Sequence, residues 1–229
     1  MSSDRRLVEQ YSGSRAKDYD LTRVKSPRYQ AEEATFEKLF ALAQPASVLD
    51  IPVGTGRWLE RYAAAGVRAL GVDASADMLG EAAEKLARIE GHRIELKQGD
   101  AFDRTFFEGL GEKFDLVACV RFLNWIPGDK VATVLANLNV VSGRHVLLGV
   151  GTLPGERGSW RRMAARLTVW WINLERRRRR RWLEHVHERS LIERVTVGLG
   201  WREVERIQIF SAKGRVNAFV LYEKEQGRP

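Results

Sequence analysis

The stretch Ser47-Val48-Leu49-Asp50-Ile51-Pro52-Val53-Gly54-Thr55-Gly56-Arg57-Trp58 predicts a strand, a tight glycine turn and the start of a helix. Residues 48–51 form a short, mainly apolar run with the length of a buried parallel strand. Gly54 and Gly56 allow a sharp turn and let a ligand approach the backbone without a Cβ in the way. A strand, turn and helix in this order present free backbone N–H groups to a nucleotide-like ligand.

The residues around the turn restrict the kind of ligand. A dinucleotide fingerprint wants a third glycine where this chain has Leu59, and a phosphate-binding loop wants Gly-Lys-Ser/Thr where Gly56 is followed by Arg57. Asp50, at the end of the strand, repels pyrophosphate but suits an ammonium group or a ribose hydroxyl. S-adenosylmethionine (SAM) has no phosphate and carries a cationic amino-acid end, so it meets these requirements.

The turn resembles motif I of the class I SAM-dependent methyltransferases, an acid followed by three glycines at alternate positions. Here the motif reads Asp50-Ile51-Pro52-Val53-Gly54-Thr55-Gly56, with Pro52 in place of the first glycine. Proline also fixes a turn and gives up one N–H. The alternative interpretation is a glycine turn in another α/β fold.

Three later segments strengthen the resemblance, because they follow in the order and at the spacing that is usual for the family. Asp73 ends a second strand, and the resemblance implies that its carboxylate binds the two ribose hydroxyls. Asp100 and the N–H that follows it are implied to read the adenine. Segment 114–126 resembles the fourth strand and its loop. The cofactor-binding residues expected from the resemblance are Tyr19, Asp50, Pro52, Gly54, Gly56, Arg57, Asp73, Ala74, Met78, Asp100, Ala101, Phe102, Val120 and Arg121.

Some of these residues have an alternative role. Tyr19 lies in a segment that resembles the family's N-terminal part, where a tyrosine commonly closes over the cofactor, but it could equally pack on the sheet edge. Asp100 and Asp103 could be turn or helix N-cap residues. Arg121 could bind an anionic substrate group or pair with a surface acid.

Strands and helices alternate from residue 46 onward, which predicts a parallel sheet covered on both faces. Strands are expected near 46–51, 67–72, 92–97, 114–120, 144–150, 203–210 and 216–223, and helices near 31–43, 57–65, 75–89, 129–140 and 188–199. The turn at Lys213-Gly214 is too short for a parallel crossover, so one of the last two strands must be antiparallel. We therefore expect an α/β, Rossmann-like, seven-stranded methyltransferase sheet, for which the resemblance implies the order 3-2-1-4-5-7-6.

The bulk properties predict a single domain over residues 1–229, because 44% hydrophobic residues suffice for a substantial core. Within it we expect an N-terminal helical cap at 1–43 and an insertion at 152–186. No 18-residue apolar run or signal peptide is found. The lone Cys119 fits a reducing environment, so we expect a cytoplasmic protein.

The chemistry expected is an in-line displacement at the methyl group, which mainly requires that nucleophile, methyl carbon and sulfur be held in line. A general base helps when the acceptor is a hydroxyl or a protonated amine. His185 and His187 are the candidate bases and Asn124 is a candidate polar catalytic residue on the substrate side, since the resemblance places all three where relatives receive substrate; the alternative is that both histidines are structural. No residues have metal-ligand spacing, so no metal is expected.

The formal charge of +8 is concentrated in one segment. Residues 156–182 hold ten arginines against Glu156 and Glu175, so the rest of the chain sums to zero. Trp160, Met163, Leu167, Trp170 (or Trp171) and Leu174 recur there at intervals of 3, 4, 3 and 4, which predicts one apolar helical stripe.

This segment has three interpretations. It could be a cap helix that packs its stripe on the domain and solvates its arginines. Residues 156–183 could instead lie on an anionic membrane surface, on the inner face of the membrane. RNA binding is the third, and it is less favoured because the stripe suits burial better than base stacking.

The function expected is methyl transfer from SAM to a small-molecule or membrane-associated (glyco)lipid acceptor. The alternatives are an RNA methyltransferase that uses the arginines for phosphates, and a non-catalytic SAM-fold protein tethered by this helix.

Overall fold

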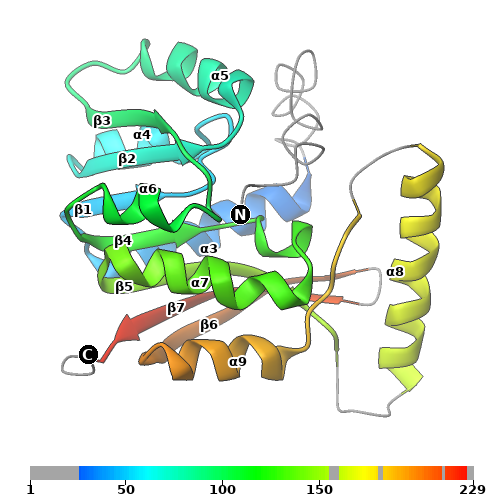
Figure 1. Cartoon of the computed structure of the whole chain (residues 1–229). Coiled ribbons are helices and arrows are strands. Elements are labelled where there is room, and N and C mark those ends of the chain that lie inside the picture. The colour runs from blue at the N-terminus through cyan, green and yellow to red at the C-terminus, as the bar shows by residue number, and fades with distance from the viewer. Residues whose placement is uncertain (1–25, 155–159, 180–182, 213–214, 226–229) are drawn as a thin grey trace.

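The chain folds around one seven-stranded sheet, as a computed structural model shows for residues 26–154, 160–179, 183–212 and 215–225 (Figure 1). The strands are β1 (Ser47–Asp50), β2 (Arg68–Asp73), β3 (Arg93–Gln98), β4 (Phe114–Cys119), β5 (Ser142–Thr152), β6 (Trp201–Ala212) and β7 (Arg215–Lys224). Their order is β3-β2-β1-β4-β5-β7-β6. Neighbours from β3 to β5 pair in parallel, whereas β7 runs antiparallel to both β5 and β6. The predicted α/β class, strand order and single antiparallel strand are confirmed.

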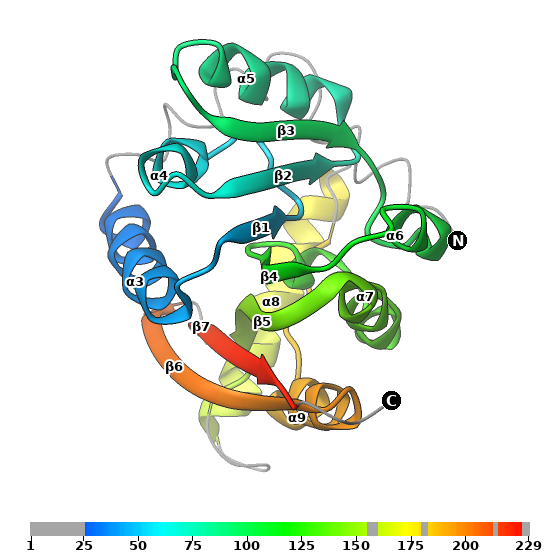
Figure 2. The same cartoon turned by 90° about the vertical axis from the view of Figure 1, so that its left-hand side faces the viewer.

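Helices cover both faces of this sheet, as the view along its strands shows (Figure 2). They are α3 (Pro27–Ala43), α4 (Leu59–Ala64), α5 (Ala76–Leu86), α6 (Arg104–Glu108), α7 (Gly128–Val141), α8 (Trp160–Arg178) and α9 (Arg189–Gly198), with a 3-10 turn η1 (Leu123–Trp125). Helices α3, α4 and α5 share one apolar core with the sheet, and α6, α7 and α9 share the other. Two separate cores are what a sheet buried on both faces requires.

Helix α3 is anchored directly beside the glycine turn. It begins earlier than the expected residue 31, because Ser26 caps it by accepting from the Tyr29 N–H and Pro27 occupies its first turn. The buried ring of Phe36 stacks on that of Trp58, with 3.9 Å between ring centroids. Trp58, at the end of the glycine turn, is therefore held in place by α3, which precedes the first strand.

The other differences between the expected and the observed elements involve only a few residues each. Helix α4 begins two residues late, because residues 54–58 are still part of the turn. Neither α6 nor η1 was expected, since a single turn of helix is too short to have a visible apolar period. Among the described residues, no helix is long and apolar enough to cross a bilayer.

Helix α8 corrects one expectation about the arginine-rich segment. The apolar stripe was expected to suit burial, yet Trp160, Met163 and Leu167 are 71%, 64% and 60% exposed. The helix packs instead through the opposite side, where Ala165 is fully buried. The interpretation that the stripe packs on the domain is therefore wrong.

Candidate cofactor and acceptor site

The glycine turn after β1 combines a positive backbone angle with open space. Gly54 has φ +58°, and a Cβ added there would meet no atom within 4 Å. Gly56 has φ +74°, but its Cβ would lie 2.3 Å from Cδ1 of Leu59. Gly56 is thus required for the turn to pack against its own helix, while Gly54 leaves room for a ligand beside the backbone.

Asp73, at the carboxyl end of β2, ties this turn to the next strand. Its Oδ2 accepts from the Gly54 N–H and its Oδ1 accepts from the Ser75 N–H, each at 2.9 Å. Burial raises the pKa of the Asp73 carboxyl, and the backbone N–H donors oppose that shift. The donors are the backbone N–H groups of Ser75, Gly54 and Ala74, and a carboxylate with about four acceptor positions can still accept from a ribose hydroxyl.

Asp50, at the carboxyl end of β1, is the second buried acid of the site and is 2% exposed. Burial raises its pKa to about 7; the Tyr62 hydroxyl, which donates to Oδ2 at 3.1 Å, lowers it, and the neighbouring charge of Asp73 raises it. A cationic group placed beside Asp50 would favour the ionised carboxylate. Tyr62 was not among the expected site residues, because only the packing of α4 brings its hydroxyl to Asp50.

The other expected cofactor residues lie at the same edge of the sheet, after the carboxyl ends of β1 to β4. They are Pro52, Ala74, Met78, Asp100, Ala101, Phe102 and Val120. Asp100 accepts from the Phe102 N–H at 3.0 Å, while Asp103 caps α6. Carboxyl ends of adjacent parallel strands meet at one edge, which is where open α/β sheets bind ligands. Tyr19, by contrast, lies outside the described residues.

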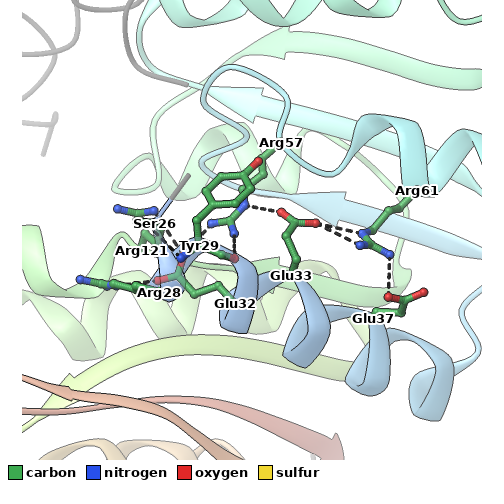
Figure 3. A network of polar contacts seen from close by, with 9 residues as sticks. All are labelled: Ser26, Arg28, Tyr29, Glu32, Glu33, Glu37, Arg57, Arg61 and Arg121. Atoms are coloured by element: carbon green, nitrogen blue, oxygen red, sulfur yellow. Dashed lines mark hydrogen bonds and ion pairs between the residues drawn. The ribbon is translucent and has the colours of Figure 1, made fainter. Parts of the chain in front are cut away.

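Arg57 and Arg121, both expected to bind cofactor, meet on one buried carboxylate (Figure 3). Glu32 Oε2 lies 2.6 Å from Arg57 Nη1 and 3.2 Å from Arg121 Nη1, and Arg28 Nε lies 2.8 Å from Oε1. Burial by itself would raise the pKa of Glu32, but the three arginines outweigh it and lower the pKa. Glu33 adds a second partner for Arg57, at 2.7 Å from Nε.

The sequence analysis missed Glu32, although one signal was available. Glu32 lies four residues before the buried Phe36, on the face of α3 that packs against the fold. A charged residue on a buried helix face requires a partner of opposite charge. The partners Arg57 and Arg121 could not be identified in the same way, because they come from the loops after β1 and β4.

The expected catalytic residues Asn124, His185 and His187 are brought together by the return of the chain from α8. The Asn124 Nδ2 donates to the carbonyls of Gly151 and His185, at 3.0 and 2.8 Å, and its Oδ1 accepts from the Gly151 N–H. This amide therefore joins the loop after β4, the end of β5 and the returning segment. Helix α9 begins at Arg189, so His187 lies just before the helix rather than within it.

The surroundings of both histidines favour the neutral form of the imidazole. Burial lowers the pKa of His187, and its hydrogen bond with the Leu123 carbonyl, 2.7 Å from Nε2, opposes the shift. Burial lowers the pKa of His185 as well, and the neighbouring His187 adds to this. If Nε2 of His187 donates to Leu123, Nδ1 is the acceptor nitrogen of the ring.

Residues 48–142 match the family model described as "Methyltransferase domain". This segment is therefore similar to a methyltransferase domain. The matched residues run from β1 to the start of β5, so they include the turn at Gly54, both buried acids and Asn124. A search of curated proteins found no match.

Solved structures share the fold of this chain over most of its length. The magnesium protoporphyrin IX methyltransferase (ChlM) of Synechocystis PCC 6803 with bound SAH has a TM-score of 0.72 and 15% identity, over 96% of this chain and 98% of that one. The N-methyltransferase NodS of Bradyrhizobium japonicum WM9 with SAH has a TM-score of 0.64 and 15% identity, over 88% and 90%. DhpI with SAH has a TM-score of 0.61 and 20% identity, over 95% and 98%.

Proposed function

We propose that this chain transfers a methyl group from SAM to a small-molecule or membrane-associated lipid acceptor. The observation that carries the proposal is the match of residues 48–142 to a methyltransferase domain, with Asp50 and Asp73 at its adjacent strand ends. Similar solved structures hold bound SAH or SAM, which supports the same cofactor here.

In this proposal the two acids divide the cofactor between them. Asp73 accepts from a ribose hydroxyl with the acceptor position left over from its bonds to backbone N–H groups. Asp50 faces the cationic amino-acid end, and the positive charge keeps its carboxylate ionised despite a pKa of about 7. The open backbone at Gly54 accommodates the cofactor between them.

Calorimetry with SAH tests the cofactor assignment. Asp73→Ala should weaken SAH binding by at least ~1–2 kcal/mol, because charge-assisted hydrogen bonds to the ribose are lost. Asp73→Asn removes the charge but keeps one acceptor oxygen for either the Gly54 or the Ser75 N–H, and thermal unfolding of both variants separates lost binding from lost folding. Asp77→Ala, which removes an exposed carboxylate four residues away, is the matched control. Unchanged affinity in Asp73→Ala would remove Asp73 from the site, and no binding by the unmodified chain would refute the proposal.

The acceptor is proposed to bind beside the segment that holds Asn124, His185 and His187. Asn124 positions the backbone there, while one of the two neutral imidazoles takes the proton that an acceptor hydroxyl or ammonium loses. The in-line geometry supplies the rest of the rate.

Replacing each histidine distinguishes a base from a structural residue. His185→Ala or His187→Ala should lower the methylation rate by about 10²-fold at unchanged SAH affinity. His187→Gln keeps a donor for the Leu123 carbonyl but has no basic nitrogen, so it should be as slow as His187→Ala if His187 is the base. Full activity of His187→Gln and of His185→Ala would mean that catalysis relies on positioning alone.

A further inference from the structure

Helix α8 carries its apolar side chains on the outside. Trp160, Met163, Leu167, Trp170 and Trp171 are between 60% and 71% exposed, and they follow one another at helical spacing. Among the described residues, the only other large hydrophobic side chains of comparable exposure are Leu42 and Val197. Large contiguous apolar patches are rare on isolated soluble domains and mark interaction surfaces.

The opposite face of α8 holds the helix on the fold, in part through polar contacts. Arg162 forms an ion pair with Glu188 and is nearly buried, beside the fully buried Ala165. The Asn173 side chain exchanges two hydrogen bonds with the backbone of Glu184, at 2.8 and 2.9 Å. These contacts fix the face with Arg162, Ala165 and Asn173 toward the fold. The apolar stripe is therefore exposed because of the way the helix packs.

The same helix carries a strong positive charge. Its 19 residues hold six arginines and one glutamate. Arg166, Arg177 and Arg178 are exposed, and Arg166 reaches Glu188 at 3.0 Å. An exposed apolar stripe with tryptophans, edged by arginines, has the composition of a helix that lies in the headgroup region of a bilayer.

We propose that the outer face of α8, formed by Trp160, Met163, Leu167, Trp170 and Trp171, docks on an anionic lipid membrane. The apolar side chains enter the boundary between headgroups and acyl chains, while the arginines contact lipid phosphates. Each arginine near an anionic surface adds to the attraction. Binding is peripheral, since no helix in the described part of the chain can span a bilayer. This docking goes beyond the proposed methyl transfer and does not depend on it.

Two other occupants fit the surface less well. A symmetric dimer through this face would bring the positive charge of one α8 against that of its partner. RNA would take the arginines, but Met163 and Leu167 in the middle of the stripe offer an apolar contact that phosphates do not use. A lipid surface satisfies both the charge and the apolar area.

The location of α8 would bring the membrane to the acceptor side of the domain. Arg176 stacks over the ring of Trp125, with 4.8 Å from Cζ to the centroid, and Trp125 lies in the loop after β4. Glu184 and Glu188, which hold α8, flank His185 and His187. Figure 1 shows α8 standing beyond the ends of the strands, and Figure 2 shows it behind the centre of the sheet. A docked α8 would therefore present the acceptor side to the lipid.

Vesicle co-sedimentation of the full chain tests the proposal. The probes are phosphatidylcholine vesicles and vesicles of phosphatidylcholine and phosphatidylglycerol in equal parts. The chain should bind the anionic vesicles at least about tenfold more tightly, and added salt should weaken the binding. Tryptophan fluorescence should shift to shorter wavelength on binding, because the exposed indoles leave water.

Two double variants separate the apolar and the charged contributions. Trp170→Ser with Trp171→Ser should lower vesicle affinity about tenfold or more. Arg177→Gln with Arg178→Gln should do the same by removing two charges. The matched controls change equivalent residues elsewhere: Leu42→Ser with Val197→Ser, and Arg104→Gln with Arg202→Gln. Both controls should bind like the unmodified chain, and equal thermal unfolding of all four would exclude misfolding as the cause.

Three results would overturn the proposal. The first is equal binding to neutral and anionic vesicles, or none to either. The second is unchanged binding of the Trp170 and Trp171 variant. The third is an absence of vesicle binding together with tight RNA binding, or with a dimer in sedimentation, that the Trp170 and Trp171 variant loses. This result would assign the face to RNA or to a second copy of the chain. SAH calorimetry on the same samples reports on the methyltransferase proposal independently.

Discussion

The pKa values of two buried carboxylates in this protein are shifted in opposite directions. Glu32 in α3 and Asp50 at the end of β1 are 1% and 2% exposed, so both have lost nearly all of their hydration. The pKa of Glu32 is lowered, because Arg121, Arg28 and Arg57 surround it and outweigh the effect of burial. Burial raises the pKa of Asp50 to about 7, since the hydrogen bond from the uncharged Tyr62 hydroxyl only partly offsets it and the charge of Asp73 adds to the shift.

Burial raises the pKa of both carboxylates, so their neighbours account for the opposite net shifts. Around Glu32 the protein supplies its own cations and uses them to join α3 to the loops after β1 and β4 (Figure 3). Around Asp50 it supplies none from the described residues. The charge of Glu32 is thus neutralised by arginines of the protein itself. Asp50, in the proposed cofactor site, would be neutralised by a cationic ligand.

The largest effect is expected from Glu32→Gln. Removing this charge leaves three arginines in contact without their shared counterion, which should lower the free energy of unfolding by about 3–5 kcal/mol. Urea titration of the unmodified chain and the variant measures the change. Since the pKa of Glu32 is lowered in the folded state, its contribution is present above the unfolded pKa and is lost as pH falls through the folded pKa. The difference in the free energy of unfolding between the unmodified chain and Glu32→Gln should therefore become smaller at acidic pH.

The rim of the same network provides the control. Glu37 pairs with Arg61 at 3.2 Å, but its side chain is 66% exposed. Glu37→Gln should cost no more than about 1 kcal/mol, because solvent screens an exposed ion pair. Equal losses for Glu32→Gln and Glu37→Gln would mean that burial does not set the strength of the network.

A smaller effect, with the opposite pH dependence, is expected for Asp50→Asn. The folded state holds the Asp50 proton up to about pH 7, while the unfolded chain releases it near its ordinary pKa of about 3.9. Asp50 therefore lowers the stability of the ligand-free protein as pH rises between these values, and Asn, which does not titrate, should remove that part of the slope. Urea titrations across this pH range measure it.

Adding SAH to the same experiment sharpens the comparison. A cation beside Asp50 favours the ionised form, so SAH affinity should rise with pH up to about 7 in the unmodified chain and stay level in Asp50→Asn. A parallel pH dependence of stability in both proteins would show that Asp50 is already ionised in the folded state.

Much of the sheet could be predicted from local patterns. Each strand that ends in an acid or a glycine turn has its signal within a few residues, as at Asp50 and Asp73, and the turn at Lys213-Gly214 required an antiparallel strand by its length. Ser75 caps α5 by accepting from the Met78 N–H, an interaction that also lies within a few residues of the chain. The short elements α6 and η1 were missed, because one turn carries no period.

The α/β alternation, the acids at the strand ends and the position of the arginine-rich helix could be predicted from the sequence, and the resemblance to a known family implied the strand order. The contacts of Glu32 with three arginines, of Asn124 with the backbone of His185, and the outward orientation of the α8 tryptophans follow from the packing of distant segments. The physical reason is the same in each case. A period of 3.6 residues reveals that a helix has two unlike faces, but which face is buried depends on residues far away in the chain that supply the contacts.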